Sequence, residues 1–285
     1  MALWYDEVFD DALRTGLRVR RTLYAAQSPF QRIEIVETPM LGKVLVLDGI
    51  FMTSVEDEFF YHEMIVHPVL TSARRIQRVL VIGGGDGGTV REVLRHPEVE
   101  RCTMVEIDEA VVRACQEHLP EIGTSWSDPR LDLRFEDGVA FVREWTGEPF
   151  DVVLLDGSDP VGPALGLFDK SFYEGVRRVL REGGLFGLQS ETPTVLPQVF
   201  FAVQETLRDV FEAVHPYFGS VLLYGGGMWT WTVASTDGAY DPRAFDERRV
   251  ARVETTSRYY NRDIHRAAFA VPTFVRRRLD PDAAG

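Results

Sequence analysis

The sequence predicts an α/β protein in which a small antiparallel β-sheet domain precedes a doubly wound parallel sheet. Over residues 16–54, alternating or β-branched runs are separated by turn residues such as Pro39 and Gly42, a pattern typical of hairpins. Beyond that point, a helical stretch is followed by short apolar strands that alternate with helical segments. Near-continuous apolar strands of this kind indicate a parallel sheet covered by helices on both faces. We therefore expect an N-terminal β-hairpin domain over residues 1–54 and a larger domain over residues 55–285.

Each strand is placed by a short apolar or alternating run. In the N-terminal domain these runs occupy residues 17–24, 33–36 and 43–47. In the larger domain the strands are expected at residues 79–82, 101–107, 132–135, 151–155, 185–189 and 213–216. A last hairpin is expected over about residues 221–234, with Gly225-Gly226-Gly227 at its turn. No linker, low-complexity stretch or internal repeat separates the two domains.

Composition and charge exclude several classes of protein. The 285 residues are 45% hydrophobic and 26% charged, as in an ordinary globular protein. No apolar run reaches the roughly 18 residues of a membrane helix, and the N-terminus has no signal-peptide pattern, so we expect no membrane association and a cytoplasmic location. The net charge of −13 argues against nucleic acid and favours cationic ligands. Cys102 and Cys115 are expected to be buried and reduced.

A glycine-rich turn follows the first strand of the predicted parallel sheet. Residues 83–88 read Gly-Gly-Gly-Asp-Gly-Gly and lead directly into a helix. Such a turn lets the backbone approach a ligand closely and presents amide groups at the start of the helix. The next strand ends at Glu106, 20 residues after Asp86, about where an acidic residue meets the ribose hydroxyls of an adenosine ligand. Together the two features predict a nucleoside cofactor.

Acidic residues also follow the third and fourth strands of this sheet. Asp137, which precedes Gly138, either caps a helix or faces an adenine amino group, and the two roles are compatible. Asp156 and Asp159 lie in a loop rich in Gly and Pro, although Asp-Gly and Asp-Pro are also ordinary turn dipeptides. Carboxylates at the mouth of a nucleoside site would bind an amine and accept its proton.

A metal site and a serine nucleophile both fail on residue spacing. His62-Glu63 and His67 resemble a zinc-protease helix, but the second histidine is five residues on, so the two imidazoles would diverge by about 140° on a helix. No segment has the two glycines of a nucleophile elbow. We expect no metal ion.

Several motifs, in order along nearly the whole chain, resemble the spermidine synthase family of polyamine aminopropyltransferases. These motifs are Leu47-Asp48-Gly49, Asp57-Glu58-Phe59-Phe60-Tyr61-His62-Glu63-Met64, Gly83-Gly84-Gly85-Asp86-Gly87-Gly88, Glu106-Ile107-Asp108-Glu109, the loop 156–164, Gln189-Ser190-Glu191 and the segment 259–269.

The resemblance implies transfer of an aminopropyl group from decarboxylated S-adenosylmethionine to a diamine, putrescine by default. The products would be spermidine and 5'-methylthioadenosine, with the donor as a co-substrate and no permanently bound cofactor. The family fold is a small β-sheet domain ahead of a methyltransferase-like, Rossmann-type domain, usually in homodimers or homotetramers. The implied donor-binding residues are Gln31, His62, Asp86, Glu106, Asp137 and Gly138. Asp156 would be the catalytic acid–base residue, and the residues around the amine would be Tyr61, Asp159, Gln189 and Tyr224.

Three departures from the family pattern leave the acceptor open. Met52 stands where the family usually has Gln, Val55-Glu56 where it has Glu and a basic residue, and Gly157 where it has Ser or Thr. Cadaverine, agmatine or a longer polyamine are therefore alternatives to putrescine. A methyltransferase that uses intact S-adenosylmethionine, and a binding module without activity, are the alternatives of other classes.

Overall fold

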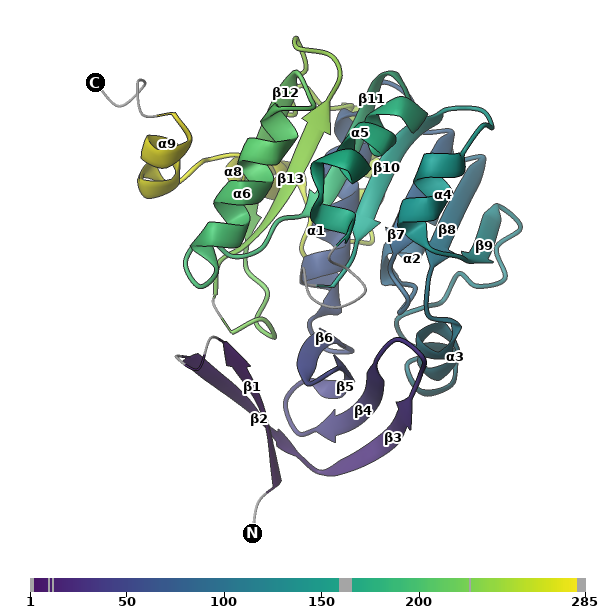
Figure 1. Cartoon of the computed structure of the whole chain (residues 1–285), viewed down its shortest axis with the longest axis vertical. Helices are drawn as coiled ribbons and strands as arrows, with labels where there is room; N and C mark the ends of the chain where they lie inside the picture. Colours follow the sequence, from purple (N-terminus) through teal and green to yellow (C-terminus); the bar gives the residue numbers. More distant parts are fainter. Residues whose placement is uncertain (1–2, 10, 12, 159–165, 226, 281–285) are drawn as a thin grey trace.

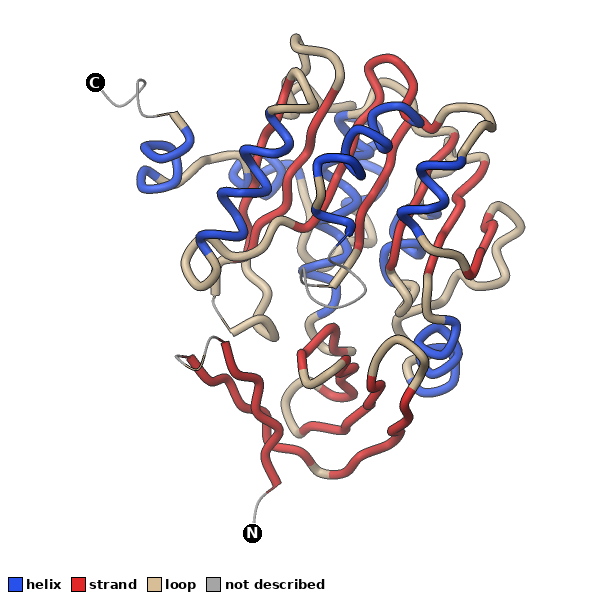
Figure 2. The backbone as a smooth tube through the Cα atoms, in the orientation of Figure 1, coloured by secondary structure: helices blue, strands red, loops and turns tan. Residues whose placement is uncertain are grey.

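The computed structural model describes residues 3–9, 11, 13–158, 166–225 and 227–280 of the chain. A seven-stranded sheet carries helices on both faces, and the N-terminal strands form two small antiparallel sheets beside its lower edge in the view of Figure 1. Figure 2 shows the same separation between the all-strand N-terminal part and the mixed larger part. The predicted α/β fold class is confirmed.

The N-terminal strands form two sheets rather than the one that was predicted. The first sheet pairs β1 (Leu3–Phe9) with β2 (Leu13–Val19), and the second has the order β3-β4-β5-β6. The bounds of the second set are β3 (Arg21–Gln27), β4 (Arg32–Thr38), β5 (Gly42–Leu47) and β6 (Ile50–Ser54). The prediction missed β1, because Trp4 and Val8 are exposed and the most buried residue of the strand is an acid, Glu7. No Gly or Pro marks the bend at Arg20, where one sheet gives way to the other.

The large sheet has the strand order β12-β13-β11-β10-β7-β8-β9. Its strands are β7 (Arg78–Gly83), β8 (Arg101–Glu106), β9 (Leu131–Phe135), β10 (Phe150–Asp156), β11 (Leu180–Gln189), β12 (Ala213–Gly219) and β13 (Trp229–Ser235). The pairs from β11 to β9 are parallel, whereas β13 runs antiparallel to both of its neighbours. Because β7 is the first strand and the chain then builds outward in both directions, the order reverses between β10 and β7. In open α/β sheets ligands bind at this switch point.

The predicted hairpin over residues 221–234 was wrong in its first arm. The hairpin partner of β13 is β12, which ends at Gly219, and residues 222–225 form turns and bends. Gly225 misled the prediction, because the residues before it form no strand. Trp231 packs parallel to Tyr217 with ring centroids 5.8 Å apart, which helps to fix the observed register.

The helices cover the sheet in two layers. In Figure 1, α4 (Gly138–Glu144), α5 (Lys170–Val179) and α6 (Pro197–Arg208) lie in front of the sheet. The opposite face is covered by α1 (Glu58–Ser72) and α2 (Gly88–Leu94), with α7 (Glu247–Glu254) and α8 (Arg262–Ala268) packed beyond them. The others are α3 (Glu109–His118), which contacts β3, and α9 (Thr273–Leu279). Among the described residues, no helix combines the length and apolarity needed to cross a membrane.

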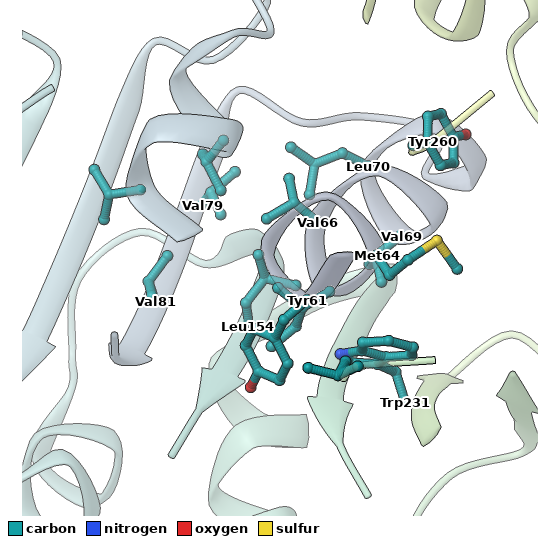
Figure 3. Close-up of a cluster of buried hydrophobic side chains, with 14 of the residues drawn as sticks. Tyr61, Met64, Val66, Val69, Leu70, Val79, Val81, Leu154, Trp231 and Tyr260 are labelled. Atoms are coloured by element: carbon teal, nitrogen blue, oxygen red, sulfur yellow. The ribbon is translucent and has the colours of Figure 1, made fainter. Parts of the chain in front are cut away.

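The first helix, α1, is the centre of the larger core. All its residues except Phe60 are buried, because it packs against β10 and β11 on one side and α2 and α7 on the other. A helix enclosed in this way has no solvent-facing side, so its charged residues need partners in the interior. Figure 3 shows its side chains among those of the sheet and of the C-terminal segment, with labels on Tyr61, Met64, Val66, Val69, Leu70, Val79, Val81, Leu154, Trp231 and Tyr260. Cys102 and Cys115 are both buried and free, as predicted.

A buried carboxylate on α1 anchors the C-terminal segment. Glu63 is 2% exposed and accepts three backbone N–H groups, from Arg258, Tyr259 and Tyr260, at 2.7, 2.9 and 2.7 Å. Backbone donors in the interior need such partners. Glu63 therefore fixes the backbone of this segment on α1, and the hydrogen bond between the Tyr260 and Thr71 hydroxyls adds to the attachment.

Replacing Glu63 with Gln should lower the free energy of unfolding by about 2 kcal/mol. The amide NH2 would face backbone N–H groups and accept no hydrogen bond from them. Chemical denaturation at one fixed protein concentration measures the change. The matched control is Glu109→Gln, since Glu109 makes an exposed pair with Arg113 and should change stability by less than about 0.5 kcal/mol. Equal losses in the two variants would contradict the anchoring role of Glu63.

Candidate active site

A cavity opens at the carboxyl ends of β7, β8 and β10, at the switch point of the sheet. The second N-terminal sheet lines its opposite wall through residues such as Leu45 and Met52. Nine of the predicted site residues line this cavity: Gln31, Tyr61, His62, Asp86, Glu106, Asp137, Gly138, Asp156 and Tyr224. Of the other two, Gln189 lines an adjoining cavity, and Asp159 lies outside the described residues.

The glycine-rich turn after β7 brings its backbone against the end of β10. Gly83 and Gly84 have φ values of +81° and +76°, which disfavour any residue with a Cβ. A Cβ on Gly83 would lie 2.2 Å from the carbonyl oxygen of Asp156, and one on Gly84 would lie 2.9 Å from Asp156 Oδ2. The Gly84 N–H donates to the same carbonyl oxygen at 2.9 Å. This close approach fixes the position of the glycine turn relative to Asp156.

Asp86 lies within this turn and is paired with His62 of α1. The Asp86 Oδ2 atom lies 3.2 Å from His62 Nε2, and Oδ1 accepts the Gly88 N–H at 2.8 Å. Burial alone would raise the pKa of Asp86, but His62 and the Gly88 N–H outweigh it and hold this pKa below its usual value. Asp86 is thus an anion in the cavity wall, suited to a cationic ligand.

Glu106 and Gln31 meet at the other side of the cavity through Asp108. The Glu106 Oε1 atom accepts the Asp108 N–H at 2.9 Å, and burial raises the pKa of Glu106 to about 7 although that N–H acts in the opposite direction. The Asp108 Oδ2 atom accepts Ser28 Oγ at 2.6 Å and Gln31 Nε2 at 3.0 Å. Asp108 therefore ties the N-terminal sheet to the end of β8 and holds Gln31 in place.

Asp137 fills the capping role that its position allowed, and its contact with an adenine amino group stays a prediction. Its Oδ1 accepts the N–H groups of Val139 and Ala140 at 2.8 and 3.3 Å, so it caps α4, and it also lines the cavity beside Gly138. A carboxylate at a helix N-terminus is stabilised by the orphan amides of the first turn.

Asp156 is held by two neutral hydroxyl donors. Tyr61 donates to its Oδ1 and Thr89 to its Oδ2, each at 2.7 Å. Burial first, and then the charge of Asp86, raise the pKa of Asp156, against the opposing effects of His62 and the two hydroxyls. Burial and the charge of Asp156 likewise hold the pKa of Tyr61 well above its usual value, so the phenol is a donor here. A carboxylate with increased proton affinity is suited to general-base work.

The adjoining cavity starts at the residues that follow Asp156 and is also acidic. It shares five lining residues with the first cavity, namely Met52, Tyr61, Gly157, Ser158 and Tyr224. The Tyr224 hydroxyl donates to the Met52 carbonyl at 2.7 Å. Its remaining wall contains Gln189, together with Glu7, Phe9, Ile50, Phe51, Glu191 and Trp229. Two carboxylates in a small apolar-walled cavity favour a flexible cation with an apolar middle.

Sequence reasoning missed Glu7 and Glu191, which line the adjoining cavity, and Thr89, which donates to Asp156. Glu191 followed Gln189 in a motif, and its φ of +66° is the kind of backbone strain that marks functional positions. Thr89 lay within the predicted helix after the glycine turn and was not singled out. Glu7 gave no signal, because the strand that holds it was itself missed.

Two of the sequence departures touch the cavities, and the third does not. Met52 and Gly157 line both cavities. Val55 and Glu56 lie beside Gly42, and neither is among the residues that line the two cavities. His62 and His67 point to different partners, since His67 contacts His96 and Glu92.

Comparison with known proteins agrees with this geometry. The sequence model described as the spermine/spermidine synthase domain matches residues 58–243, and the one described as the spermidine synthase tetramerisation domain matches residues 3–54. The polyamine aminopropyltransferase of Thermoanaerobacter sp. (strain X514) is 42% identical over 276 residues, which cover 97% of this chain and 98% of the relative. That of Bacillus subtilis (strain 168) is 40% identical over 273 residues, which cover 96% and 97%.

Solved structures give the same result. A crystal structure of a spermidine synthase in complex with the transition state analogue AdoDATO superimposes with a TM-score of 0.93 at 38% identity, covering 97% of this chain and 94% of that one. The spermidine synthase from Thermotoga maritima has a TM-score of 0.90 at 36% identity, with the same coverage of both chains. With both family models and full-length relatives in agreement, the chain belongs to the spermidine synthase family of polyamine aminopropyltransferases.

Proposed function

We propose that the chain transfers the aminopropyl group of decarboxylated S-adenosylmethionine to putrescine, giving spermidine and 5'-methylthioadenosine. The observation that carries this proposal is the pair of partly buried carboxylates, Asp86 and Asp156, that follow adjacent strands and line one cavity. A similar spermidine synthase binds a transition state analogue, which supports a transfer reaction rather than binding alone. Cadaverine, agmatine and a longer polyamine stay as alternative acceptors, because Met52 and Gly157 alter the shared wall of the two cavities.

The first cavity would hold the donor. Its adenosine would lie along the ends of β8 and α4, against Glu106, Asp137, Gly138 and Gln31. The aminopropyl tail would reach toward the anionic Asp86 and the adjacent His62. The nucleoside part needs polar groups that fix its orientation, and the tail needs an anion.

The adjoining cavity would hold the acceptor. One amine would lie at Asp156, beside Tyr61, and the methylene chain would pass the apolar wall near Trp229. The far ammonium would lie near Gln189, Glu191 and Glu7. We assign Asp159 to the same site on the family resemblance alone.

The charges explain why the reaction needs these acids. The donor is a sulfonium with a cationic tail and the acceptor is a diammonium, and two such charges about 4 Å apart repel by roughly 4 kcal/mol at an effective dielectric near 20. Asp156 takes one proton from the acceptor ammonium. The freed nitrogen lone pair attacks the aminopropyl carbon bonded to sulfur, the bond between that carbon and sulfur breaks, and its electrons stay on sulfur as the thioether of 5'-methylthioadenosine. The product nitrogen keeps its two protons as a secondary ammonium, which takes over the positive charge of the sulfonium, so charge and atoms balance.

We also propose that the chain divides at about residue 54 and assembles as a homodimer or homotetramer through its N-terminal hairpin. Trp4 and Val8 on β1 are 57% and 53% exposed, and an isolated two-stranded hairpin is only marginally stable in water. The match of residues 3–54 to a tetramerisation domain supports a second copy of the chain as the partner.

Asp156→Asn should lower turnover by about 10²–10⁴-fold at saturating substrates, because the amide accepts no proton from the acceptor. Steady-state production of 5'-methylthioadenosine, followed by mass spectrometry, measures this. The control is Asp132→Asn on β9, a residue that pairs with Arg101 and Arg134 away from the cavity. Turnover of Asp156→Asn close to that of the control would rule out the base role.

Asp86→Asn should weaken binding of the decarboxylated donor by about tenfold or more, since one lost charge contact of 1.4 kcal/mol is a factor of ten in affinity. Intact S-adenosylmethionine carries an extra carboxylate on its tail, so the same substitution should weaken its binding less. The difference in affinity between the two donors should therefore become smaller. Calorimetric titration of both donors measures this, and 5'-methylthioadenosine, which lacks the tail, is the control ligand. If the unmodified protein prefers intact S-adenosylmethionine, a methyltransferase takes the place of this proposal.

Glu191→Gln should raise the KM for putrescine by about tenfold, because it removes one anion from the far end of the adjoining cavity. The KM for the donor should stay the same, since Glu191 does not line the first cavity. Initial rates with putrescine, cadaverine and agmatine, each at saturating donor, measure both constants. Glu205→Gln, on the exposed side of α6, is the control. A larger effect on the donor than on the acceptor would place the acceptor elsewhere.

A further inference from the structure

His62 has carboxylates on both sides of its ring. Its Nδ1 lies 2.6 Å from Glu58 Oε2, one turn earlier on α1, and its Nε2 lies 3.2 Å from Asp86 Oδ2. All six histidines of the chain are among the described residues, and in the other five no more than one ring nitrogen lies near a carboxylate. His67, for example, pairs with Glu92 through Nε2 but faces another imidazole through Nδ1.

This geometry favours two ring protons on His62. A neutral imidazole has one N–H and one lone pair, so it would direct a lone pair at one of the two carboxylates. A doubly protonated ring donates to both. Burial opposes the charge, because His62 is 1% exposed, but Asp86 and Glu58 outweigh burial and hold the pKa of His62 well above its usual value.

Glu58 is held rigidly in its role. Arg91 of α2 donates to Oε1 at 3.1 Å and to Oε2 at 2.7 Å, a bidentate pair. Arg91 is itself fixed by the Ile122 carbonyl oxygen at 2.9 Å and by Glu92 at 2.8 Å. The two bonds to Arg91 leave Glu58 little freedom to turn away from His62.

The ring of His62 is also confined by the backbone of α2. A Cβ placed on Gly88 would lie 2.3–2.6 Å from three atoms of the imidazole, so the ring packs directly on that glycine. The imidazole cannot move away from Asp86 without leaving this position. Its charge is therefore held at one place in the cavity wall.

The charge of His62 stabilises the anionic form of Asp86 more than that of Asp156. Asp86 Oδ2 lies 3.2 Å from the imidazole, whereas Asp156 is held by the neutral hydroxyls of Tyr61 and Thr89. Pairs of carboxylates whose surroundings separate their proton affinities divide into a fixed anion and an acid–base group. The neighbouring Asp57, which also feels the charge of His62, is fixed by Ser54 and Leu223.

We propose that Glu58, clamped by Arg91, is a positioning residue that keeps both nitrogens of His62 protonated. The resulting imidazolium makes Asp86 the fixed anion of the site and leaves Asp156 as the proton acceptor. This inference rests on the proposed function, in which Asp156 is the base. Glu58 lines neither cavity, so it acts only through His62.

The test is Glu58→Gln in the full-length protein, with two measurements. First, ¹⁵N NMR of histidine-labelled protein follows His62, assigned by the signal that His62→Gln removes. The unmodified protein should show His62 as an imidazolium at pH 8, where an unperturbed histidine is neutral, and Glu58→Gln should lower the His62 pKa by at least about one unit, a tenfold loss of proton affinity. Titration of His62 near its ordinary value in the unmodified protein would overturn the proposal, even if the variant failed to fold.

The second measurement is the pH profile of kcat. Loss of a cation beside two carboxylates raises their proton affinity, so the acid limb should move to higher pH in Glu58→Gln by at least about half a unit. Glu92→Gln is the matched control: it removes an equally buried carboxylate that also contacts Arg91 but not His62, and it should leave the limb in place. If the acid limb lies at the same pH in the unmodified protein and both variants, or moves equally in both variants, Glu58 is a structural residue and not a positioning residue. Failure of the proposed function is seen separately, in turnover retained by Asp156→Asn, because the NMR measurement needs no turnover.

Discussion

The backbone contact between the glycine turn and the end of β10 determines where the groups of the cavity lie. Gly84 donates to the Asp156 carbonyl oxygen, and the approach is too close for a side chain on the turn. Because of this contact, Asp86 on the turn and Asp156 on the strand share one buried cavity. Two carboxylates in such a place raise each other's pKa, and burial adds to the effect. The same contact that brings the acids together therefore requires other residues to separate their proton affinities.

One helix supplies those residues. Tyr61 and His62 of α1 contact Asp156 and Asp86 respectively, while Glu63, the next residue, points to the C-terminal segment. Helix α1 can do this because it is enclosed on all sides, so neighbouring residues on it face different parts of the molecule. Precise placement of charged groups needs supporting groups that are themselves fixed. The burial of α1 and the clamp of Arg91 on Glu58 provide that support.

The sequence predicted the parallel sheet and the acids of the first cavity, because each of these acids follows a strand within a local motif. Asp86, Glu106 and Asp156 come together through sheet topology alone, which short apolar strands reveal. Prediction failed where position depends on tertiary contacts. The strand β1 has exposed apolar residues and a buried acid, so its pattern is reversed at Glu7. The partner of β13 is set by packing of Trp231 on Tyr217, which no local signal reports.

The two cavities are consequently lined by elements of different stability. The first cavity, the proposed donor site, is built from central strands of a seven-stranded sheet, each paired with a strand on both sides. The adjoining cavity, the proposed acceptor site, takes Glu7 and Phe9 from a two-stranded hairpin, whose outer face exposes Trp4 and Val8. Hairpins of this size need further packing to be stable. In an assembly of several copies, burial of that face would hold Glu7 in place, so acceptor binding is the part of the proposed function most directly linked to oligomer formation.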